Sequence, residues 1–419
     1  MSVSPIFSDR VMARLDKLGR ISEVPEHLTR TTYTPAHRQA NELVGGWMRE
    51  AGMQVHQDGI GNLIGRLPAA DNSAPWLMLG SHLDTVRNAG KYDGMLGVIA
   101  AIACVEEIRK QGLRLPFGIE LVGFTNEEGT RFGTAMTGSR AIAGCFEPPM
   151  LEAKDRDGIS FTQAMHDFGL DPASIADCAW PADIAGRKLA AFMELHIEQG
   201  PVLEANNLAL GVVTAISGAR RYRVEMKGLA GHAGTVPMGS RRDALLAASE
   251  AALYIERRCT GTPTLVGTVG QMEALPGAVN VIPGLARFSI DIRAGVDDVR
   301  DKAADDVLAE VQAIAQRRNV ALTVTPLYNS AATPCDPRLM AAVEAAIKAQ
   351  NIPSMHLPSG AGHDAMTIAD LCPVGMIFMR CTKGISHNPL EAVLPQDVEL
   401  ATAALYHFIT HFDPAALAA

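Results

Sequence analysis

Five side chains of the types that bind divalent metal ions lie at or after the ends of short apolar segments of the chain. They are His82, Asp93, Glu128, His196 and His387. Imidazole nitrogens and carboxylate oxygens together suit zinc or manganese, with cobalt or nickel as alternatives, and one carboxylate can bridge two ions. Because the carboxyl ends of parallel strands meet at one edge of a sheet, we expect these side chains to converge there. The pattern predicts a site for two divalent cations, as in two-metal hydrolases.

Each of these motifs taken alone also fits a purely structural role. His82 could stand on a surface turn, and Asp93 could cap the helix that begins near residue 95. Glu128 could belong to a solvated loop, His196 could form a hydrogen bond in the core, and His387 could be an ordinary loop histidine. Their occurrence together at the strand ends of one predicted sheet favours the metal site.

Two more acidic residues lie beside the predicted ligands. Glu127 directly precedes Glu128 after an apolar strand. Neighbouring side chains in an extended segment point to opposite sides, so one can bind metal while the other faces the reacting water. Asp84 follows His82 by two residues, and it can accept a hydrogen bond from the second ring nitrogen of that histidine.

The hydrophobic pattern places these residues on an α/β framework. Short continuous apolar runs predict buried strands, and apolar residues spaced three and four apart predict helices. We expect strands at 76–79, 119–124, 191–195 and 373–379, and helices at 36–51, 95–110, 338–350 and 396–411. Strands that alternate with helices indicate a mostly parallel central sheet flanked by helices.

The pattern changes between residues 213 and 328. Polar and apolar residues alternate in 221–226 and 286–293, as in strands of an antiparallel sheet with one wet face. Helical stretches at 241–257 and 296–317 accompany them. We therefore predict a discontinuous metal-binding catalytic domain at 1–212 and 329–419, with a smaller α+β domain inserted at 213–328.

Length, composition and charge narrow the classes of partner. The chain has 419 residues, of which 47% are hydrophobic and 20% charged, and its net charge is −9. This length suggests two domains. The excess of acid disfavours nucleic acid or an anionic membrane as a partner, because both need a basic surface. The longest apolar run, Leu96–Val105, is about half of the ~20 residues that a membrane-spanning helix needs.

The cysteines and the start of the sequence bear on the compartment. The seven cysteines are widely spaced without a C-x-x-C pair. This favours reduced thiols in a cytoplasmic protein over disulfides or a zinc–cysteine site. Residues 1–5 contain no basic region and are not followed by an apolar stretch, so we expect no signal peptide.

Taken in order along essentially the whole chain, the motifs resemble one family. The most specific stretches are Gly80–Thr85, Asp93–Gly97, Glu127–Gly129, Met193–Gly200, Gly231–Met238 and Gly360–Ala365. They are similar to the M20 metallopeptidase-like superfamily, and most closely to its hydantoinase/carbamoylase branch. That branch contains N-carbamoyl-L-amino acid hydrolases, allantoate amidohydrolases and β-ureidopropionases. Its peptidase relatives usually have an acidic ligand where this chain has His196, which favours the carbamoylase branch.

The resemblance implies a role for each residue of the site. Asp93 would bridge two ions and Glu127 would be the general base. The remaining ligands would be His82, Glu128, His196 and His387. Substrate contacts would come from Gln199, His232, Asn280, Arg293 and Gly362, together with Arg220 or Arg221. His232 would also stabilise the oxyanion, and Arg293 would clamp a substrate carboxylate, for which guanidinium geometry is suited.

These implied substrate contacts also have structural alternatives. The glycine-rich segment around His232 could be a plain hairpin loop, and Arg293 could be a solvated charge at a strand end. Gly362 precedes a helix that we expect to begin near His363, and amides at that start could bind an anion. The same segment could equally be a glycine-rich turn in which Asp364 caps the helix.

The resemblance implies an enzyme that cuts the ureido C–N bond of N-carbamoyl-L-amino acids or allantoate, with release of ammonia and carbon dioxide. The substrate would be a small ureido or amide compound that bears a carboxylate, and the inserted domain would be the lid and dimerisation domain of a homodimer. An M20 aminoacylase or dipeptidase is the first alternative. A catalytically inactive ligand-binding relative is the second, but such a protein is expected to lose ligands, and all five are present.

Overall fold

The computed structural model describes residues 6–180 and 188–417, which form two compact units. The first unit consists of Met1–Val213, Cys335–Leu357 and Gly362–Ala419, and the second of Thr214–Pro334 and Pro358–Ala361. The expectation that residues 1–5 carry no signal peptide lies outside the described residues.

The first unit is built on a mixed α/β sheet whose centre is parallel. Its central strands, in spatial order, are β4 (Gly118–Phe124), β3 (Trp76–His82), β5 (Leu189–Ile197) and β16 (Val374–Met379). All three pairings between them are parallel. Every residue of these strands is buried, as expected where helices cover both faces of a parallel sheet. The four predicted apolar strands are therefore confirmed.

Further strands extend this sheet on both sides. They are β1 (Gln54–Gln57) and β2 (Leu63–Leu67) beyond β4, and β6 (Leu210–Ile216), β14 (Thr333–Pro334) and β15 (His356–Ser359) beyond β16. Strands β2 and β6 run antiparallel to the central strands that they join. The predicted parallel arrangement thus holds for the centre of the sheet and not for its edges.

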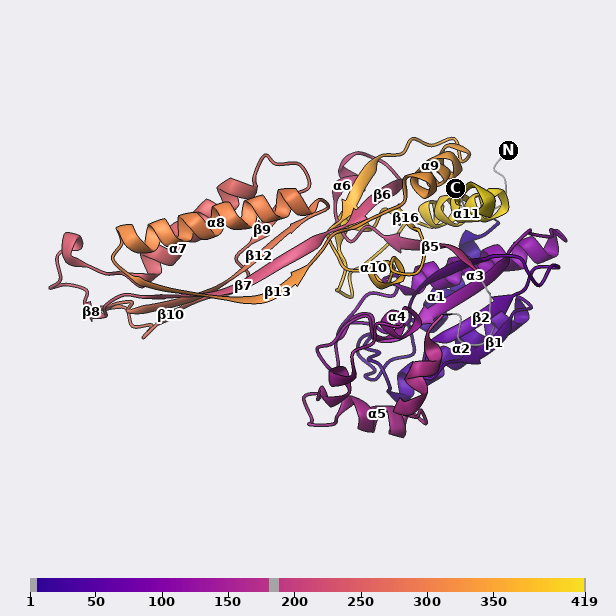
Figure 1. Ribbon diagram of the computed structural model, residues 1–419, viewed down its shortest axis with the longest axis horizontal. Coiled ribbons are helices and arrows are strands. Elements are labelled where there is room, and N and C mark those ends of the chain that lie inside the picture. Colours follow the sequence, from indigo (N-terminus) through magenta and orange to yellow (C-terminus); the bar gives the residue numbers. More distant parts are fainter. Residues whose placement is uncertain (1–5, 181–187, 418–419) are drawn as a thin grey trace. The chain divides into compact units, whose positions relative to one another are not determined.

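Helices accompany the sheet of the first unit, and some of them contact its central strands directly (Figure 1). The longer ones are α1 (Ser8–Leu18), α2 (Pro35–Glu50), α3 (Met95–Lys110), α9 (Pro337–Lys348) and α11 (Pro395–His411). The shorter ones are α4 (Thr137–Ile142), α5 (Phe161–Asp167), α6 (Val202–Ala205) and α10 (Ala365–Ile368). Helix α3 is buried almost all round, and Cβ on its Gly97 would lie 2.3 Å from the carbonyl oxygen of Leu195 in β5. This close approach fixes α3, and the loop before it, against the strand ends.

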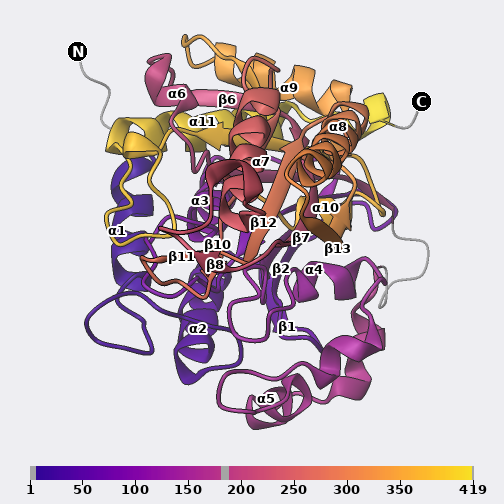
Figure 2. The same ribbon diagram turned by 90° about the vertical axis from the view of Figure 1, so that its left-hand side faces the viewer.

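The second unit is an antiparallel sheet with helices on one face. Its strands are β7 (Gly218–Lys227), β9 (Val266–Thr268), β10 (Met272–Leu275), β12 (Leu285–Ala294) and β13 (Ala321–Ser330). Figures 1 and 2 show α7 (Ala244–Cys259) and α8 (Asp297–Arg317) side by side along this sheet. Alternate residues of β7 and β12 form the core with these helices, which confirms the predicted alternation. The other face is open, and a two-stranded pair, β8 (Gly231–His232) with β11 (Val281–Ile282), completes the unit.

Within residues 6–180 and 188–417, no helix has both the length and the apolar character needed to cross a membrane.

Candidate metal centre

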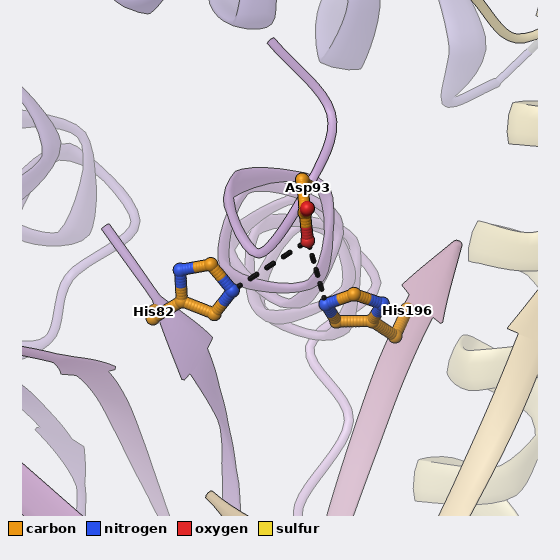
Figure 3. A group of neighbouring side chains, drawn as sticks. All are labelled: His82, Asp93 and His196. Carbon is orange, nitrogen blue, oxygen red and sulfur yellow. Dashed lines mark ion pairs between the residues drawn. The ribbon is translucent and has the colours of Figure 1, made fainter. Parts of the chain in front are cut away.

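The predicted ligands come together at the carboxyl ends of the central strands. His82 is the last residue of β3, His196 is the last but one of β5, and Glu128 follows β4 in the next loop. Asp93 lies in the loop before α3, and its carboxylate points between the rings of His82 and His196 (Figure 3). Four of the five predicted ligands are contributed by the N-terminal half of the chain.

One group of potential ligands faces the first carboxylate oxygen of Asp93. Oδ1 of Asp93 lies 3.2 Å from Nε2 of His196 and 3.7 Å from Nε2 of His82. One donor atom from each of these three residues lies within 4.8 Å of the others. All three side chains are buried. Two imidazoles and one carboxylate oxygen at these separations fit a zinc-type ligand set.

A second group faces the other oxygen of the same carboxylate. Oδ2 of Asp93 lies 3.1 Å from Nε2 of His387, which in turn lies 3.6 Å from Oε1 of Glu128. These three residues also bring one donor atom each within 4.8 Å. Because each oxygen of Asp93 faces a different group, the donor set fits two cations that share one carboxylate. The arrangement supports divalent metal binding.

Backbone carbonyls orient the two buried histidines. Nδ1 of His82 lies 2.9 Å from the carbonyl oxygen of Asp84, and Nδ1 of His196 lies 2.8 Å from that of Ile197. If each Nδ1 carries the proton and donates it, each Nε2 is left with the lone pair that a metal needs. The expectation that the carboxylate of Asp84 accepts from His82 is wrong, because the main-chain oxygen of Asp84 does so.

The carboxylate of Asp84 instead holds the loop that carries the two adjacent acids. The backbone N–H of Glu127 donates to Oδ1 of Asp84 at 3.1 Å, and that of Glu128 donates to Oδ2 at 3.3 Å. Oε2 of Glu127 lies 3.9 Å from Nε2 of His82. The buried Asp84 therefore fixes the positions of the expected base and of one expected ligand relative to the strand end.

A further acid, Glu391, was not predicted and supports Asp93 from the C-terminal part of the chain. Its Oε1 accepts hydrogen bonds from the backbone N–H groups of Tyr92 at 2.8 Å and Asp93 at 3.2 Å. Its Oε2 lies 2.8 Å from the hydroxyl of Ser386, which is also 3.0 Å from Oδ2 of Asp93. No local pattern in the sequence signals this contact, because Glu391 lies 298 residues after Asp93.

A fully buried arginine, also not predicted, braces the same strand end. Nε of Arg30 donates to the carbonyl of Leu83 at 2.8 Å, and Nη1 donates to the carbonyls of Leu18 and Ile21. Burial lowers the pKa of Arg30 to about 10, although the nearby Asp84 opposes this shift. Arg30 thus ties the end of α1 to the segment between His82 and Asp84.

Burial beside the histidines shifts the pKa values of the acids in this site. Burial raises the pKa of Glu127 well above its ordinary value, and Glu128 adds to the effect while His82 opposes it. Burial and Asp93 raise the pKa of Glu128 to about 7. Burial alone would raise the pKa of Asp93, but hydrogen bonds from His196, His387 and His82 hold that pKa well below the usual range. A bound cation acts in the same direction as these histidines on every carboxylate here.

Gln199, a predicted substrate contact, lies against the second ligand group. Its Nε2 donates to Oδ2 of Asp93 at 2.8 Å and lies 3.4 Å from Nε2 of His387. The backbone φ of Gln199 is 58°, a value that residues other than glycine rarely adopt. The amide therefore reaches the centre from a strained turn directly after β5.

Other predicted substrate contacts lie in the second unit, where Arg293 borders a cavity of about 600 Å³ on the open face of the sheet. Nε and Nη2 of Arg293 both donate to the carboxylate of Asp291, at 2.8 and 2.9 Å, and Nη1 donates to the carbonyl of Gly360. Nε of Arg221 donates to the same carboxylate at 2.8 Å. Two guanidinium groups thus share one carboxylate, which leaves an excess positive charge at this cavity.

Arg220 does not lie at this cavity. It forms ion pairs with Asp301, at 3.0 Å, and with Asp305, both in α8 on the covered face of the sheet. Arg221 points to the open face and borders the cavity with Arg293. Of the two arginines left open by the sequence, Arg221 and not Arg220 borders this cavity.

The remaining predicted contacts lie in loops. His232 and Asn280 are both exposed and lie close together in the second unit. The backbone N–H of Ala233, the residue after His232, donates to the carbonyl of Asn280 at 2.9 Å. Gly362, in the first unit, precedes α10. That helix begins at Ala365, two residues after the expected start near His363, and it has four residues.

An α/β core that gathers two groups of histidine and acid ligands around one shared carboxylate defines a candidate metal-dependent hydrolase. The comparison with known families agrees. The chain belongs to the peptidase family M20/M25/M40, whose profile matches residues 78–411.

Similar proteins narrow the family further. The chain is 41% identical to an N-carbamoyl-L-amino acid amidohydrolase of Geobacillus stearothermophilus, over 96% of this chain and 98% of that protein. It is 38% identical to an allantoate deiminase of Arabidopsis thaliana, over 96% of this chain and 82% of that protein. Among solved structures, an amidase of the hydantoinase/carbamoylase family from Burkholderia multivorans superposes with a TM-score of 0.90 at 33% identity, over 96% of this chain and 97% of that one.

Proposed function

We propose that this chain hydrolyses the ureido C–N bond of N-carbamoyl-L-amino acids or of allantoate, with release of ammonia and carbon dioxide. The observation that carries the proposal is the carboxylate of Asp93, whose two oxygens face two separate ligand groups at the ends of parallel strands. The relatives named for N-carbamoyl-L-amino acids and for allantoate support this class of substrate. The chain is accordingly a hydrolase of non-peptide C–N bonds.

Two divalent ions would be bound, zinc or manganese by preference and cobalt or nickel as alternatives. One would be held by His82, Asp93 and His196, and the other by Asp93, Glu128 and His387. When bound, such ions polarise a substrate carbonyl and make water more acidic.

Glu127 is the proposed general base. It accepts the proton of the attacking water and then delivers that proton to the leaving nitrogen, so that one carboxyl group serves both steps. Burial raises the pKa of Glu127, which suits a group that must both take and return a proton near neutral pH. Asp84 holds the backbone of Glu127 and thereby positions its carboxylate.

Arg293 is the proposed partner of the substrate carboxylate, with Arg221 beside it. The shared Asp291 keeps both guanidinium groups in place before substrate arrives. Gln199 is proposed to contact the ureido group, and His232 is proposed to stabilise the oxyanion. Asn280 and Gly362 complete the proposed contacts, as the family resemblance implies.

A panel of substrates tests the proposal directly. Ammonia release would be measured with allantoate, N-carbamoyl-L-amino acids, N-carbamoyl-β-alanine and N-acetyl amino acids, with added manganese or zinc. We expect turnover of at least one ureido compound that bears a carboxylate, and loss of this turnover after treatment with a chelator. Hydrolysis of N-acetyl substrates alone would contradict the proposal.

The variant Glu127→Gln tests the base separately from the ligands. We expect kcat to fall by about 10²- to 10⁴-fold, the usual contribution of a general base, while the metal content measured by mass spectrometry stays unchanged. Glu42→Gln, a change at an exposed acid of α2, is the matched control. Turnover of Glu127→Gln close to that of the control would remove Glu127 from the mechanism.

An M20 aminoacylase or dipeptidase remains the alternative, and it is less well supported. The relatives compared above are named for ureido substrates. The histidine at position 196 also favours the carbamoylase branch. The cytoplasmic location stays a prediction. The homodimer stays a prediction that light scattering would test, and the lid or dimerisation role of residues 213–328 stays one that closed-state structures would test.

A further inference from the structure

A third group of metal-binding side chains in the first unit contains neither Asp93 nor His82. Glu194, His196 and His363 bring one donor atom each within 4.8 Å of one another. Their side chains are 1%, 1% and 2% exposed. The rings of His196 and His363 pack edge to face with centroids 4.5 Å apart. The group therefore has the composition and the spacing of a metal site, and it lies next to the pair of groups described above.

The carboxylate of Glu194 is only half satisfied. The hydroxyl of Ser81 donates to its Oε1 at 2.8 Å. Its Oε2 is buried without a hydrogen-bond partner among the described residues. A second carboxylate, that of Asp364, is fully buried beside His363. Unpaired carboxylate oxygens are costly to bury, and a divalent cation is a partner that would remove this cost.

Glu194 does not act as the usual outer-shell partner of His196. In many metal sites a carboxylate accepts a hydrogen bond from the ring nitrogen that does not bind metal. Here Nδ1 of His196 already has the carbonyl of Ile197 as its partner, at 2.8 Å. The free oxygen of Glu194 therefore needs a different partner, and His363 supplies a second nitrogen ligand for a cation at that position.

The third group and the group with Asp93 compete for the same nitrogen. If Nδ1 of His196 donates to the backbone, only Nε2 has a lone pair, and one lone pair binds one cation. An ion held by His196 can thus lie either with His82 and Asp93 or with Glu194 and His363. The two positions exclude each other.

We propose that Glu194, His196 and His363 form an alternative position for the divalent ion that otherwise lies with His82 and Asp93. This inference rests on the proposed function, because it takes His196 as a metal ligand. Two imidazoles and one carboxylate oxygen suit zinc or cobalt. At the alternative position the ion has left the shared carboxylate of Asp93, so a chain that holds it there is a resting form.

Removal of His82 separates the two positions, because His82 belongs only to the first. Metal-free His82→Asn protein would be titrated with Co²⁺, and the bound ions per chain would be counted by mass spectrometry and by cobalt absorption. We expect two ions per chain, one of them bound about 10- to 100-fold more weakly than in the wild type. The double variant His82→Asn/His363→Gln is expected to bind one. The matched control, His82→Asn/His166→Gln, changes an exposed histidine of α5 and should still bind two.

A second variant and a direct observation keep the test decisive. His82→Asn/Glu194→Gln should also bind one ion, and circular dichroism would verify that each variant is folded. In crystals of His82→Asn, anomalous scattering at the cobalt edge should place the ion beside Glu194 and His363. If His82→Asn binds one ion, or if neither second substitution changes the count, the alternative position is refuted. Wild-type ammonia release tests the proposed function independently of this count.

Discussion

The two sheets of this protein differ in how they accommodate charge. In the first unit, the central strands are buried along their whole length, and the acids at their ends are buried with them. In the second unit, alternate residues of β7 and β12 face an open side of the sheet. The charged groups there, such as Arg221, Arg287 and Asp291, form ion pairs and stay partly exposed.

Because of this difference, a charged residue costs little free energy on the second sheet and much more at the strand ends of the first. An ion pair at an exposed position contributes about 0–1 kcal/mol, so the open face of the second sheet accepts charges at little cost. A buried carboxylate is costly unless a cation or a hydrogen bond neutralises it. The buried acids of the first unit, Asp84, Asp93 and Glu194 among them, are therefore the ones that need a partner such as a metal ion.

The largest effect is expected from Asp93→Asn, compared with Asp291→Asn in the second sheet. The first change removes one negative charge from both ligand groups, so we expect loss of both ions and of measurable turnover. The second changes an acid whose carboxylate accepts hydrogen bonds from Arg221 and Arg293 and that belongs to neither ligand group, so both ions should remain bound. Metal analysis and ammonia release on both variants make the comparison. Equal metal loss in the two would erase the distinction between the sheets.

A smaller effect is expected from Asp84→Asn, which leaves every proposed ligand in place. An amide has one acceptor oxygen, so one of the two backbone hydrogen bonds from Glu127 and Glu128 must be lost. Changes in such supporting residues typically lower metal affinity or activity by about 10- to 100-fold. Metal titration and kcat would be measured together. Wild-type values for both would show that the loop keeps its position without Asp84.

On the open sheet, Arg221→Ala and Arg220→Ala should behave differently although the residues are adjacent. Arg221 shares the cavity with Arg293, and hydrogen bonds to charged groups contribute about 1.5–3 kcal/mol. We therefore expect Arg221→Ala to raise KM by about tenfold or more with little change in kcat. Arg220→Ala removes ion pairs to α8 and should change unfolding more than KM. A larger rise of KM in Arg220→Ala would reverse this assignment.

The smallest effect on turnover at neutral pH is expected from His37→Asn, because His37 is buried in the first unit away from the proposed ligands and contributes to the pH dependence of stability. Burial lowers its pKa to about 3, and the positive charges of Arg30 and Arg38 contribute. The unfolded chain binds a proton near pH 6.5, and the folded chain does not until about pH 3, so stability falls as the pH drops below 6.5. At pH 5 the loss from this residue is about 2 kcal/mol.

The measurement is urea unfolding of wild type and His37→Asn at pH 7.5 and pH 5. The variant loses packing against Phe168 at both pH values. The drop in its free energy of unfolding from pH 7.5 to pH 5 should nevertheless be smaller than the drop in the wild type. An identical pH dependence in both proteins would show that His37 is not the group that titrates.

The sequence predicts the centre of the first sheet well because local patterns encode it. Continuous apolar runs fix β3, β4, β5 and β16, and the strand ends then gather the residues that follow them. The alternation along β7 also predicts that the two adjacent arginines lie on opposite faces of their sheet. Arg221 is in phase with Arg223 and Glu225 on the open face, whereas Arg220 is in phase with the buried Tyr222.

Contacts between distant parts of the chain could not be predicted in this way. Glu391, near the C-terminus, binds the loop of Asp93. Arg30, near the N-terminus, binds the strand end beside that loop. A buried arginine or a loop glutamate has no periodicity of its own. The choice between the carbonyl and the carboxylate of Asp84 also depends on a turn geometry that the sequence pattern does not specify. The short edge strands were missed because few residues carry each pattern.

The dependence of Asp93 on Glu391 has a consequence for the order of events during synthesis. A ribosome that adds about 5–20 residues per second needs about 15 to 60 seconds to make the 298 residues between them. Once His196 has been made, the nascent chain has His82, Asp93 and His196 but still lacks Glu391, which braces the loop of Asp93. Stable loading with metal is thus an event of the finished polypeptide, and a ribosome-bound intermediate should lose its ion readily to a competing chelator.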